Sequence, residues 1–569
     1  MTAQPTRPAA GPESTAPADS PLSADAAPPL ATALPEPESP VRPGLWERLG
    51  DPPRKPLWTG FAGSVILLVG GVGGGGTLIH DPVLTNTALG FWRYGHGREL
   101  ATALMYLGVV LLAWAWVQLG RRVIARTVGG RAVLTIALAW IAPMLVGPPL
   151  FTRDIYSYLA QGSLPLFGLD TYGVGPEAMP GVFADNVHYF WQNTPAPYGP
   201  LFILIAKGWS WVTLQAGGNM ILGVIGMRVI MCLGLLLLIR TLPELTRRLG
   251  GRPALALWIV VANPVTVVHL IGGGHNDLLL VGFLTLGCLV ALRGKHVLGI
   301  VLVTFAMGTK ASAAVALPFL VLIWAADLQG SFPRRLVRAG VASVAVFVVT
   351  FGLISVAAQV GLGWLPALSA PSMIVNWLSI PTGVGEFVHT LLAGAWNLPK
   401  QPFINVARII GAIALVAIVA VQWWRARVGG PEAVRRAGVA LLAVALLSPA
   451  TLPWYLSWGM AILAMVPWSA RGLQWLVFGS LWLMIVYYPS GEAGLYNWPY
   501  LIVCGILAGF AARALLRPAP VGLDPRPVPV RPTGALMSGA GSSGSGSSGS
   551  GASGSGKSGA ATREPAVRG

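Results

Sequence analysis

The segment "FTRDIYSYLAQG", residues 151–162, places a carboxylate and a guanidinium together in a chain that has few ionisable residues. Asp154 could remove a proton from a substrate hydroxyl group, which is the role of a general base. Arg153 could bind a phosphate group or hold the loop in place. Neighbouring residues in a helix point about 100° apart, so the two side chains need not contact each other. Asp154 is therefore the candidate catalytic base.

Three further cations, Lys310, Arg228 and Arg408, occur where the sequence is otherwise apolar. Lys310 follows the apolar stretch 295–309 and precedes a second one, 311–326. Each stretch has about fifteen residues, which form about 22 Å of helix, whereas the membrane core is about 30 Å thick. The turn at Lys310 should therefore lie below the outer membrane surface or in a water-filled cavity. Buried cations are costly unless they are paired or bind an anion, so all three are candidates for a phosphate site.

Polar and aromatic residues between the apolar stretches could hold a sugar. They are Tyr198, His275, Asn276, Asp277, Trp454 and Tyr455. A base, cations and a sugar site together suit the transfer of a sugar from a lipid phosphate. The phosphate leaves without a general acid, so one carboxylate suffices, unlike the pair that glycoside hydrolases use. A single displacement would invert the anomeric centre and convert a β-linked donor into an α-linked product.

Each candidate also has a purely structural explanation. Asp154 could be the N-cap of the helix that follows it. Lys310 could extend to the membrane interface. Arg228 and Arg408 could pair with carboxylates of the loops. Trp454 and Tyr455 could belong to the aromatic belt of the interface. His275 could be a hydrogen-bonded turn residue, and it resembles no metal triad. We predict no metal-binding residue, and a requirement for a divalent ion stays open.

The elements that must position these residues are membrane helices. Hydrophobic residues make up 54% of the 569 residues and charged residues only 10%. A membrane helix takes about 20 residues, and the apolar runs lack the alternation of a barrel strand. We therefore predict an all-α polytopic membrane protein with about fourteen spans. They are residues 58–78, 101–119, 132–151, 219–240, 254–271, 275–292, 295–309, 311–326, 336–357, 403–423, 435–450, 455–467, 471–489 and 498–516.

Lys and Arg residues indicate the orientation of these spans. They gather in the loops 121–131, 240–252, 334–338 and 425–436. Short positive loops stay in the cytoplasm, so both termini are predicted to be cytoplasmic and the intervening loops extracytoplasmic. The net charge of +17 then reflects topology and contact with anionic membrane lipids, not nucleic-acid binding.

The same orientation defines the parts of the chain. The two longest extracytoplasmic loops are 152–218 and 358–402. Within the first loop, residues 201–215 are predicted to form an amphipathic helix that lies in the outer interface. Residues 1–57 and 517–569 are predicted to be disordered cytoplasmic tails, the second of them rich in Gly and Ser.

Six motifs, in this order, closely resemble the actinobacterial polyprenol-phosphate-mannose-dependent α-1,6-mannosyltransferases, the MptA and MptB proteins of the GT-C class. They are "FTRDIYSYLAQG", "TPAPYGPLFILIAKG", "ANPVTVVHLIGGGHNDLLLVG", "GTKASAAVALPFL", "NWLSIPTG" and "LPWYLSW". The resemblance runs from about residue 58 to 516. Residues 80–97, with "HDPVL" and "FWRYGHG", are more similar to MptA, which extends the distal mannan backbone, than to MptB. Asp277 is a departure, because the family often has Glu there.

The resemblance implies a multi-pass plasma-membrane enzyme with a GT-C fold over residues 58–516 and an extracytoplasmic active site. Its donor would be polyprenyl-phosphate-mannose, and its acceptor a lipid-anchored α-1,6-mannan of lipomannan or lipoarabinomannan. Asp154 would be the base, with Arg153 beside it. The donor phosphate would meet Lys310, Arg228 and Arg408, and the six sugar-site residues named above would line the sugar and acceptor cleft.

Two alternatives remain beside this reading. Donors that carry arabinose or glucose would require similar cations and a similar base, so the choice of mannose depends on the resemblance. Outside the enzymes, a lipid or sugar transporter would also have many spans and intramembrane charges. The charges of this chain gather on the outer side instead of the midplane, which favours the enzyme. The sequence leaves the oligomeric state open.

Overall fold

The computed structural model describes residues 45–393 and 397–517. Within these ranges the protein is helical, with twenty α-helices and no named strand, and one isolated bridge joins Tyr487 and Ala493. The predicted all-α class is confirmed. The predicted tails lie mostly outside the described residues. The described part of the first contains α1 (Leu45–Arg48) and the start of α2.

Each of the fourteen predicted spans overlaps one α-helix, although several of these helices are shorter than the predicted span. The helices are α2 (Arg54–Gly74), α3 (Gly95–Ile124), α4 (Gly130–Ile141), α8 (Met220–Arg248), α9 (Pro253–Val260), α10 (Asp277–Leu292), α11 (His296–Thr309), α12 (Leu317–Ala326), α13 (Phe332–Ala358), α16 (Lys400–Arg425), α17 (Gly430–Leu447), α18 (Ser457–Leu463), α19 (Ala470–Ile485) and α20 (Trp498–Ala514). In the described residues, five helices are long and apolar enough to cross a membrane, or six with one bent pair. The count of about fourteen spans is therefore not confirmed, although the helices themselves are present.

The bent pair corrects one predicted span, residues 254–271. The chain bends by 50° between α9 and a π-helix, Val265–Gly274. Pro264 lacks an amide hydrogen and cannot continue the helical ladder of α9. The side chain of Asn263 accepts a hydrogen bond from the Val265 amide (2.9 Å) and so stabilises the bend. Because the π-helix ends where α10 begins, the break delivers residues 275–277 to the interior of the molecule.

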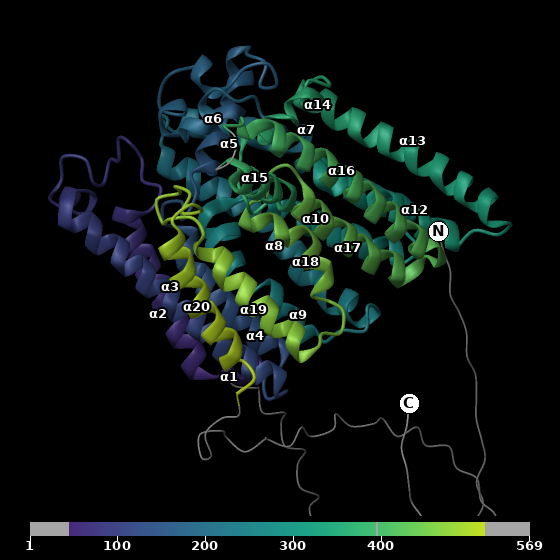
Figure 1. Ribbon diagram of the computed structural model, residues 1–569, viewed down its shortest axis with the longest axis horizontal. Helices are drawn as coiled ribbons and strands as arrows, with labels where there is room; N and C mark the ends of the chain where they lie inside the picture. Colours follow the sequence, from purple (N-terminus) through teal and green to yellow (C-terminus); the bar gives the residue numbers. More distant parts are fainter. Residues whose placement is uncertain (1–44, 394–396, 518–569) are drawn as a thin grey trace, which may run out of the picture. The chain divides into compact units, whose positions relative to one another are not determined.

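Three of the four basic loops lie together at one end of the helices. Arg252 donates a hydrogen bond to the Val123 carbonyl (2.5 Å), and Arg435 donates one to the Leu249 carbonyl (3.0 Å). Figure 1 shows α1 at this end and α5, α6 and α14 at the opposite end. Three of the basic loops are therefore on one side, as the charge pattern predicts.

Both long loops contain helices. The first holds α5 (Asp154–Ser163), α6 (Tyr189–Gln192) and α7 (Pro200–Gln215), so the predicted helix at 201–215 is present. The second holds α14 (Trp364–Ala367) and α15 (Ile380–Ala393). The hydropathy pattern did not indicate α15, because the segment carries Pro381, Gly383 and Gly385. It packs closely against α16.

Helices α8 and α10 pack backbone to backbone at two glycines. A Cβ atom at Gly234 would overlap the carbonyl oxygen of Leu278, and one at Gly282 would overlap Gly234. Small residues permit such close approach of membrane helices. The contact matters for the site because α10 begins at Asp277.

Substitution of Gly234 should therefore destabilise the protein. We expect Gly234→Ala to cost about 1–3 kcal/mol, since the added methyl group must push two helices apart. Gly352→Ala on α13 is the matched control, because its Cβ would meet nothing within 4 Å. Thermal unfolding in detergent checks this result. Equal melting temperatures for the two variants would contradict the proposed tight α8–α10 contact.

Candidate active site

Asp154 is the first residue of α5, and its side chain is only 15% exposed. Arg153 occupies the N-cap position without a side-chain cap, so the carboxylate of Asp154 is not the N-cap. The turn before it is fixed by Phe151, whose side chain is fully buried and whose φ is 59°. A non-glycine residue in the left-handed region is strained, and such strain clusters at functional sites.

The surroundings of Asp154 raise the pKa of its carboxyl group. Burial raises the pKa of Asp154 to about 6, and the nearby Asp277 carboxylate acts in the same direction. Lys310 opposes both effects, and so do hydrogen bonds with Thr152 and Trp191. A carboxyl group with a pKa near neutrality is suited to accept and release a proton.

His275 lies beneath this carboxylate. Its Nδ1 atom is 3.6 Å from Oδ2 of Asp154 and 3.5 Å from the Tyr158 hydroxyl. The imidazole stacks on the Trp454 indole, with ring centroids 3.6 Å apart. Both His275 and Asn276 have no exposed surface. The sequence analysis predicts that His275 and Asn276 line the sugar and acceptor cleft. In the structure both are buried behind the residues that line it.

Lys310 and Asp277 form a buried ion pair. The ammonium donates to both carboxylate oxygens at 3.0 Å, and the Trp458 indole donates to the same carboxylate at 2.5 Å. The Tyr455 ring lies under the ammonium, 4.3 Å from it. Lys310 is therefore held inside the protein by this ion pair, with its side chain only 14% exposed. Asp277 itself is fully buried and holds Lys310 in place.

Two cavities meet at Asp154. The first, which we call the Lys310 cavity, has a volume of about 180 Å³. The second, which we call the aromatic cavity, has a volume of about 210 Å³. The Lys310 cavity includes Asp154, Tyr198, Lys310, Trp454, Tyr455 and Trp458. The aromatic cavity includes Arg153, Asp154, Tyr189, Trp191, Trp454 and Tyr496. Asp154, Trp191, Leu452 and Trp454 line both, so the carboxylate stands where the two spaces join.

The other predicted cations bind backbone carbonyls. Arg228 is fully buried and donates to the carbonyls of Leu145, Gly147 and Gly272 at 2.8–2.9 Å, apart from both cavities. Arg153 lines the aromatic cavity and donates to the Asn186 carbonyl. Arg408 lies at the edge of the Lys310 cavity, where it holds carbonyls of the loop before α15. None of the three is paired with a loop carboxylate in the described structure.

Sequence reasoning missed the aromatic side chains of the second cavity. Residues 188–191 read "HYFW", and these rings lie close together, with the centroids of Tyr189 and Phe190 4.7 Å apart. Four consecutive residues with ring side chains in a loop could have indicated a sugar-binding surface. Trp458 was also missed, because it looks like an ordinary residue of an apolar helix until Asp277 is placed beside it.

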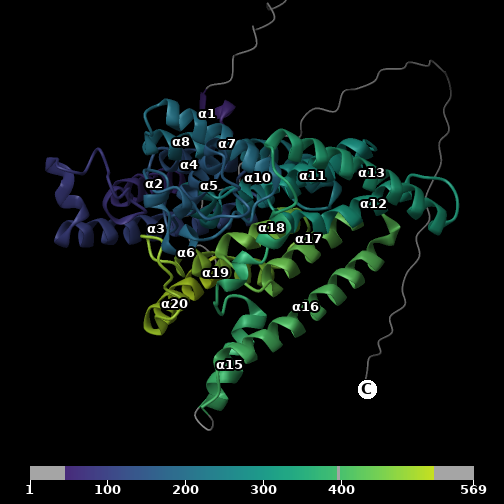
Figure 2. The same cartoon turned by 90° about the horizontal axis from the view of Figure 1, so that it is seen from above.

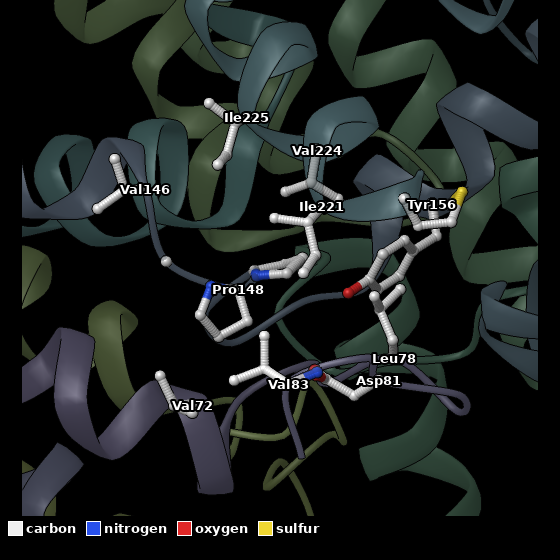
Figure 3. Close-up of a pocket in the computed structure, with 13 residues that line it drawn as sticks. Val72, Leu78, Asp81, Val83, Val146, Pro148, Tyr156, Ile221, Val224 and Ile225 are labelled. Atoms are coloured by element: carbon white, nitrogen blue, oxygen red, sulfur yellow. The ribbon is translucent and has the colours of Figure 1, made fainter. Parts of the chain in front are cut away.

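Another cavity, of about 180 Å³, lies between α2, α8 and the segment before α5 (Figure 3). Its walls are mainly aliphatic, and its two polar side chains already have partners. The Tyr156 hydroxyl donates to the Gly76 carbonyl (2.6 Å), and Asp81 accepts from the Val83 and Leu84 amides. This cavity therefore offers mainly an aliphatic surface. Among the described residues, no cluster of three or more His, Cys, Asp or Glu residues is arranged to hold a metal ion.

Comparisons with known proteins identify the family of the chain. Residues 57–326 match the family model "Alpha-(1->6)-mannopyranosyltransferase, N-terminal domain", and residues 381–517 match "MptB C-terminal domain". The chain is 39% identical to alpha-(1->6)-mannopyranosyltransferase A of Mycobacterium tuberculosis, over 80% of this chain and 88% of the relative. It is 31% identical to the A protein of Corynebacterium glutamicum, over 78% and 95%.

The B protein of Corynebacterium glutamicum is 30% identical, over 77% of this chain and 75% of the relative. No solved structure matches the chain. The two relatives from Corynebacterium glutamicum are almost equally identical to this chain, at 31% and 30%, and the 39% identity to the A protein of Mycobacterium tuberculosis supports the MptA-like assignment. The chain belongs to the α-(1→6)-mannopyranosyltransferase family and is an MptA-like mannosyltransferase.

Proposed function

We propose that this mannosyltransferase moves mannose from polyprenyl-phosphate-mannose to a lipid-anchored α-1,6-mannan at the outer face of the plasma membrane. The observation that carries the proposal is the position of Asp154 between a cavity with a cation and a cavity with aromatic walls. A transferase must bring a donor and an acceptor together at one base, and this arrangement provides a space for each.

The Lys310 cavity suits the donor. Its cation can meet the phosphate, and the aromatic side chains of Tyr455 and Trp458 line the same space. As the bond between the sugar and the phosphate breaks, negative charge grows on the phosphate. Lys310 is held ready by Asp277 and can stabilise that charge without first reorganising. Tyr198 completes the wall on the side of α7.

The aromatic cavity suits the acceptor chain. Its rings, from α6 and from the loop before α20, can stack against successive mannose units. The 6-hydroxyl of the terminal mannose would lie against Asp154, which takes its proton as the oxygen attacks the anomeric carbon. The attack comes from the side opposite the phosphate and inverts that carbon. His275 keeps the carboxylate in place from below.

The orientation rests on the basic loops. They gather at the end of the molecule that lies opposite α5 and α6, and positive loops remain cytoplasmic (Figure 1). Both cavities would then open to the extracytoplasmic side, where nucleotide sugars are absent and lipid phosphates carry the sugars. This arrangement also fits a GT-C fold with its long first outer loop.

The pH dependence of kcat/KM should report on Asp154. The base must be ionised, and its pKa is raised from 3.8 to about 6. Activity should therefore be full above pH 7 and fall by about tenfold for each unit well below pH 6. Burial lowers the pKa of His188, which pairs with Glu492 in the aromatic cavity, so His188 is a second titratable group near the site and His188→Gln is the control. A midpoint near pH 4 in the wild type, or one that moves with His188→Gln, would contradict the assignment.

A comparison of donors tests the proposed function. Purified full-length protein in liposomes is given a short α-1,6-mannoside acceptor and one radiolabelled donor. The donors are polyprenyl phosphates that carry mannose, arabinose or glucose, and GDP-mannose. We expect mannose to be transferred and GDP-mannose to be inert. Preference for arabinose or glucose would reassign the sugar, and transfer from GDP-mannose alone would overturn the lipid-phosphate donor.

A further inference from the structure

A deep apolar groove lies between α15 and the first half of α16. Its volume is about 600 Å³, and every side chain that lines it is apolar. The groove arises where the two helices touch at glycines. A Cβ atom at Gly385 would be 2.7 Å from the Cα atom of Ile404, and one at Gly411 would be 2.7 Å from Pro381. Val384, Val406 and Ile410 stand more than half exposed at its edges.

The groove lies on a part of the protein where α16 is largely exposed. Only 11% of the most apolar window of α16 is buried, against 22% to 50% in the other four long apolar helices. Figure 2 shows α15 and α16 extending away from the rest of the helices. Since α16 rises 1.5 Å per residue, the groove follows it for about 18 Å, from Pro402 to Ala414. This space suits a long flexible hydrocarbon chain.

The inner end of the groove adjoins the Lys310 cavity. Leu447 lines the groove, and the next two residues, Ser448 and Pro449, line the cavity. Arg408 lies on α16 beside the groove and donates to the carbonyls of Ser372 (2.8 Å) and Pro449 (3.0 Å). Both of these residues line the Lys310 cavity. Arg408 therefore stands at the junction of the two spaces.

The charged groups in and around the Lys310 cavity leave no net positive charge for an anionic ligand. Lys310 is already paired with Asp277, and Asp154 adds a second carboxylate. An anionic phosphate that enters this space needs positive charge beyond Lys310. Arg408 can supply it, because its four hydrogen bonds all go to neutral oxygen atoms, those of Thr382, Ser372, Ile374 and Pro449.

We propose that the groove holds the isoprenoid chain of a polyprenyl phosphate, whose phosphate lies between Arg408 and Lys310. The proposal rests on the proposed function and adds to it the place where the lipid lies. Both parts of the lipid match the protein. The apolar groove can hold the isoprenoid chain, and Arg408 at its inner end can bind the phosphate. The lipid would slide in from the membrane beside α16 and bring its sugar next to Asp154.

Photo-crosslinking tests this placement without turnover. The full-length protein is placed in phosphatidylcholine liposomes that contain polyprenyl phosphate with a diazirine on its isoprenoid chain. After illumination, the labelled peptides are mapped. We expect labels within residues 380–414. Ala414→Trp, which obstructs the inner end of the groove, should lower this labelling at least about tenfold. Ile413→Trp is the matched control, because Ile413 is 66% exposed and lies outside the groove.

Competition identifies the ligand. Unlabelled polyprenyl phosphate should abolish the signal, whereas polyprenol, which lacks the anion, and phosphatidic acid, which lacks the isoprenoid chain, should compete weakly. Labels that map elsewhere or persist in Ala414→Trp would overturn the groove. Equal competition by phosphatidic acid would make it a general lipid site. Mannose transfer by the wild type is measured separately, so loss of the proposed function and loss of the groove are distinguished.

Discussion

Asp154→Asn should lower the kcat of mannose transfer by about 10²- to 10⁴-fold while leaving the fold intact. A positioned general base contributes a factor of about 10² to 10⁴ to a rate. Asp154 is the one carboxylate among the residues that line both cavities, so no other carboxylate lies where the acceptor hydroxyl would react. Asparagine has the same shape as aspartate but cannot take the proton. The loss should appear in kcat, with little change in the KM of the donor.

The variant Asp277→Asn distinguishes the role of Asp277 from that of Asp154. Asp277 has no exposed surface and binds Lys310 and Trp458, so asparagine there should weaken the position of Lys310 without removing the base. We expect a smaller loss of kcat than for Asp154→Asn at matched amounts of folded protein. Full activity in Asp154→Asn, together with an inactive Asp277→Asn, would move the base to Asp277.

Lys310→Met should have the second largest effect. Loss of a cation that stabilises the leaving phosphate should lower kcat/KM by about 10² to 10³. The same change leaves the Asp277 carboxylate buried without its partner, which costs about 3–5 kcal/mol of stability. Activity and thermal stability should therefore fall together in this single variant.

The double variant Lys310→Met and Asp277→Asn distinguishes the two effects. Without the buried carboxylate, the stability penalty should largely disappear, and the Trp458 indole keeps an amide oxygen to bind. Activity should stay low because the cation is still absent. If the double variant recovers both stability and transfer, Lys310 is only a structural partner of Asp277 and the phosphate lies elsewhere.

Local sequence patterns predicted the helices and the two central residues. Apolar runs indicated all fourteen helices, because hydropathy is a property of neighbouring residues. The scarcity of charge singled out Asp154 and Lys310, and the short stretches on either side of Lys310 placed it below the surface. The bend at Pro264 had a visible signal in "ANPV", but the surrounding residues were apolar enough to suggest one continuous span.

The partners of these residues could not be predicted, since they depend on how distant segments pack. Lys310 and Asp277 are 33 residues apart, and Asp277 and Trp458 are 181 apart. Arg228 was a candidate for the phosphate because it is charged in an apolar helix. Three backbone carbonyls, two of them from the turn before α5, bind it instead. Only tertiary structure brings those carbonyls within reach.

The stereochemistry of transfer tests the central claim, a single displacement with Asp154 as the base. The wild-type protein is given β-linked polyprenyl-phosphate-mannose and an α-1,6-dimannoside, and the anomeric configuration of the new linkage is read by NMR from the coupling between C1 and H1. Our account predicts an α-linked product, by inversion. A β-linked product would require a covalent mannosyl intermediate or another nucleophile, and it would contradict the role assigned to Asp154.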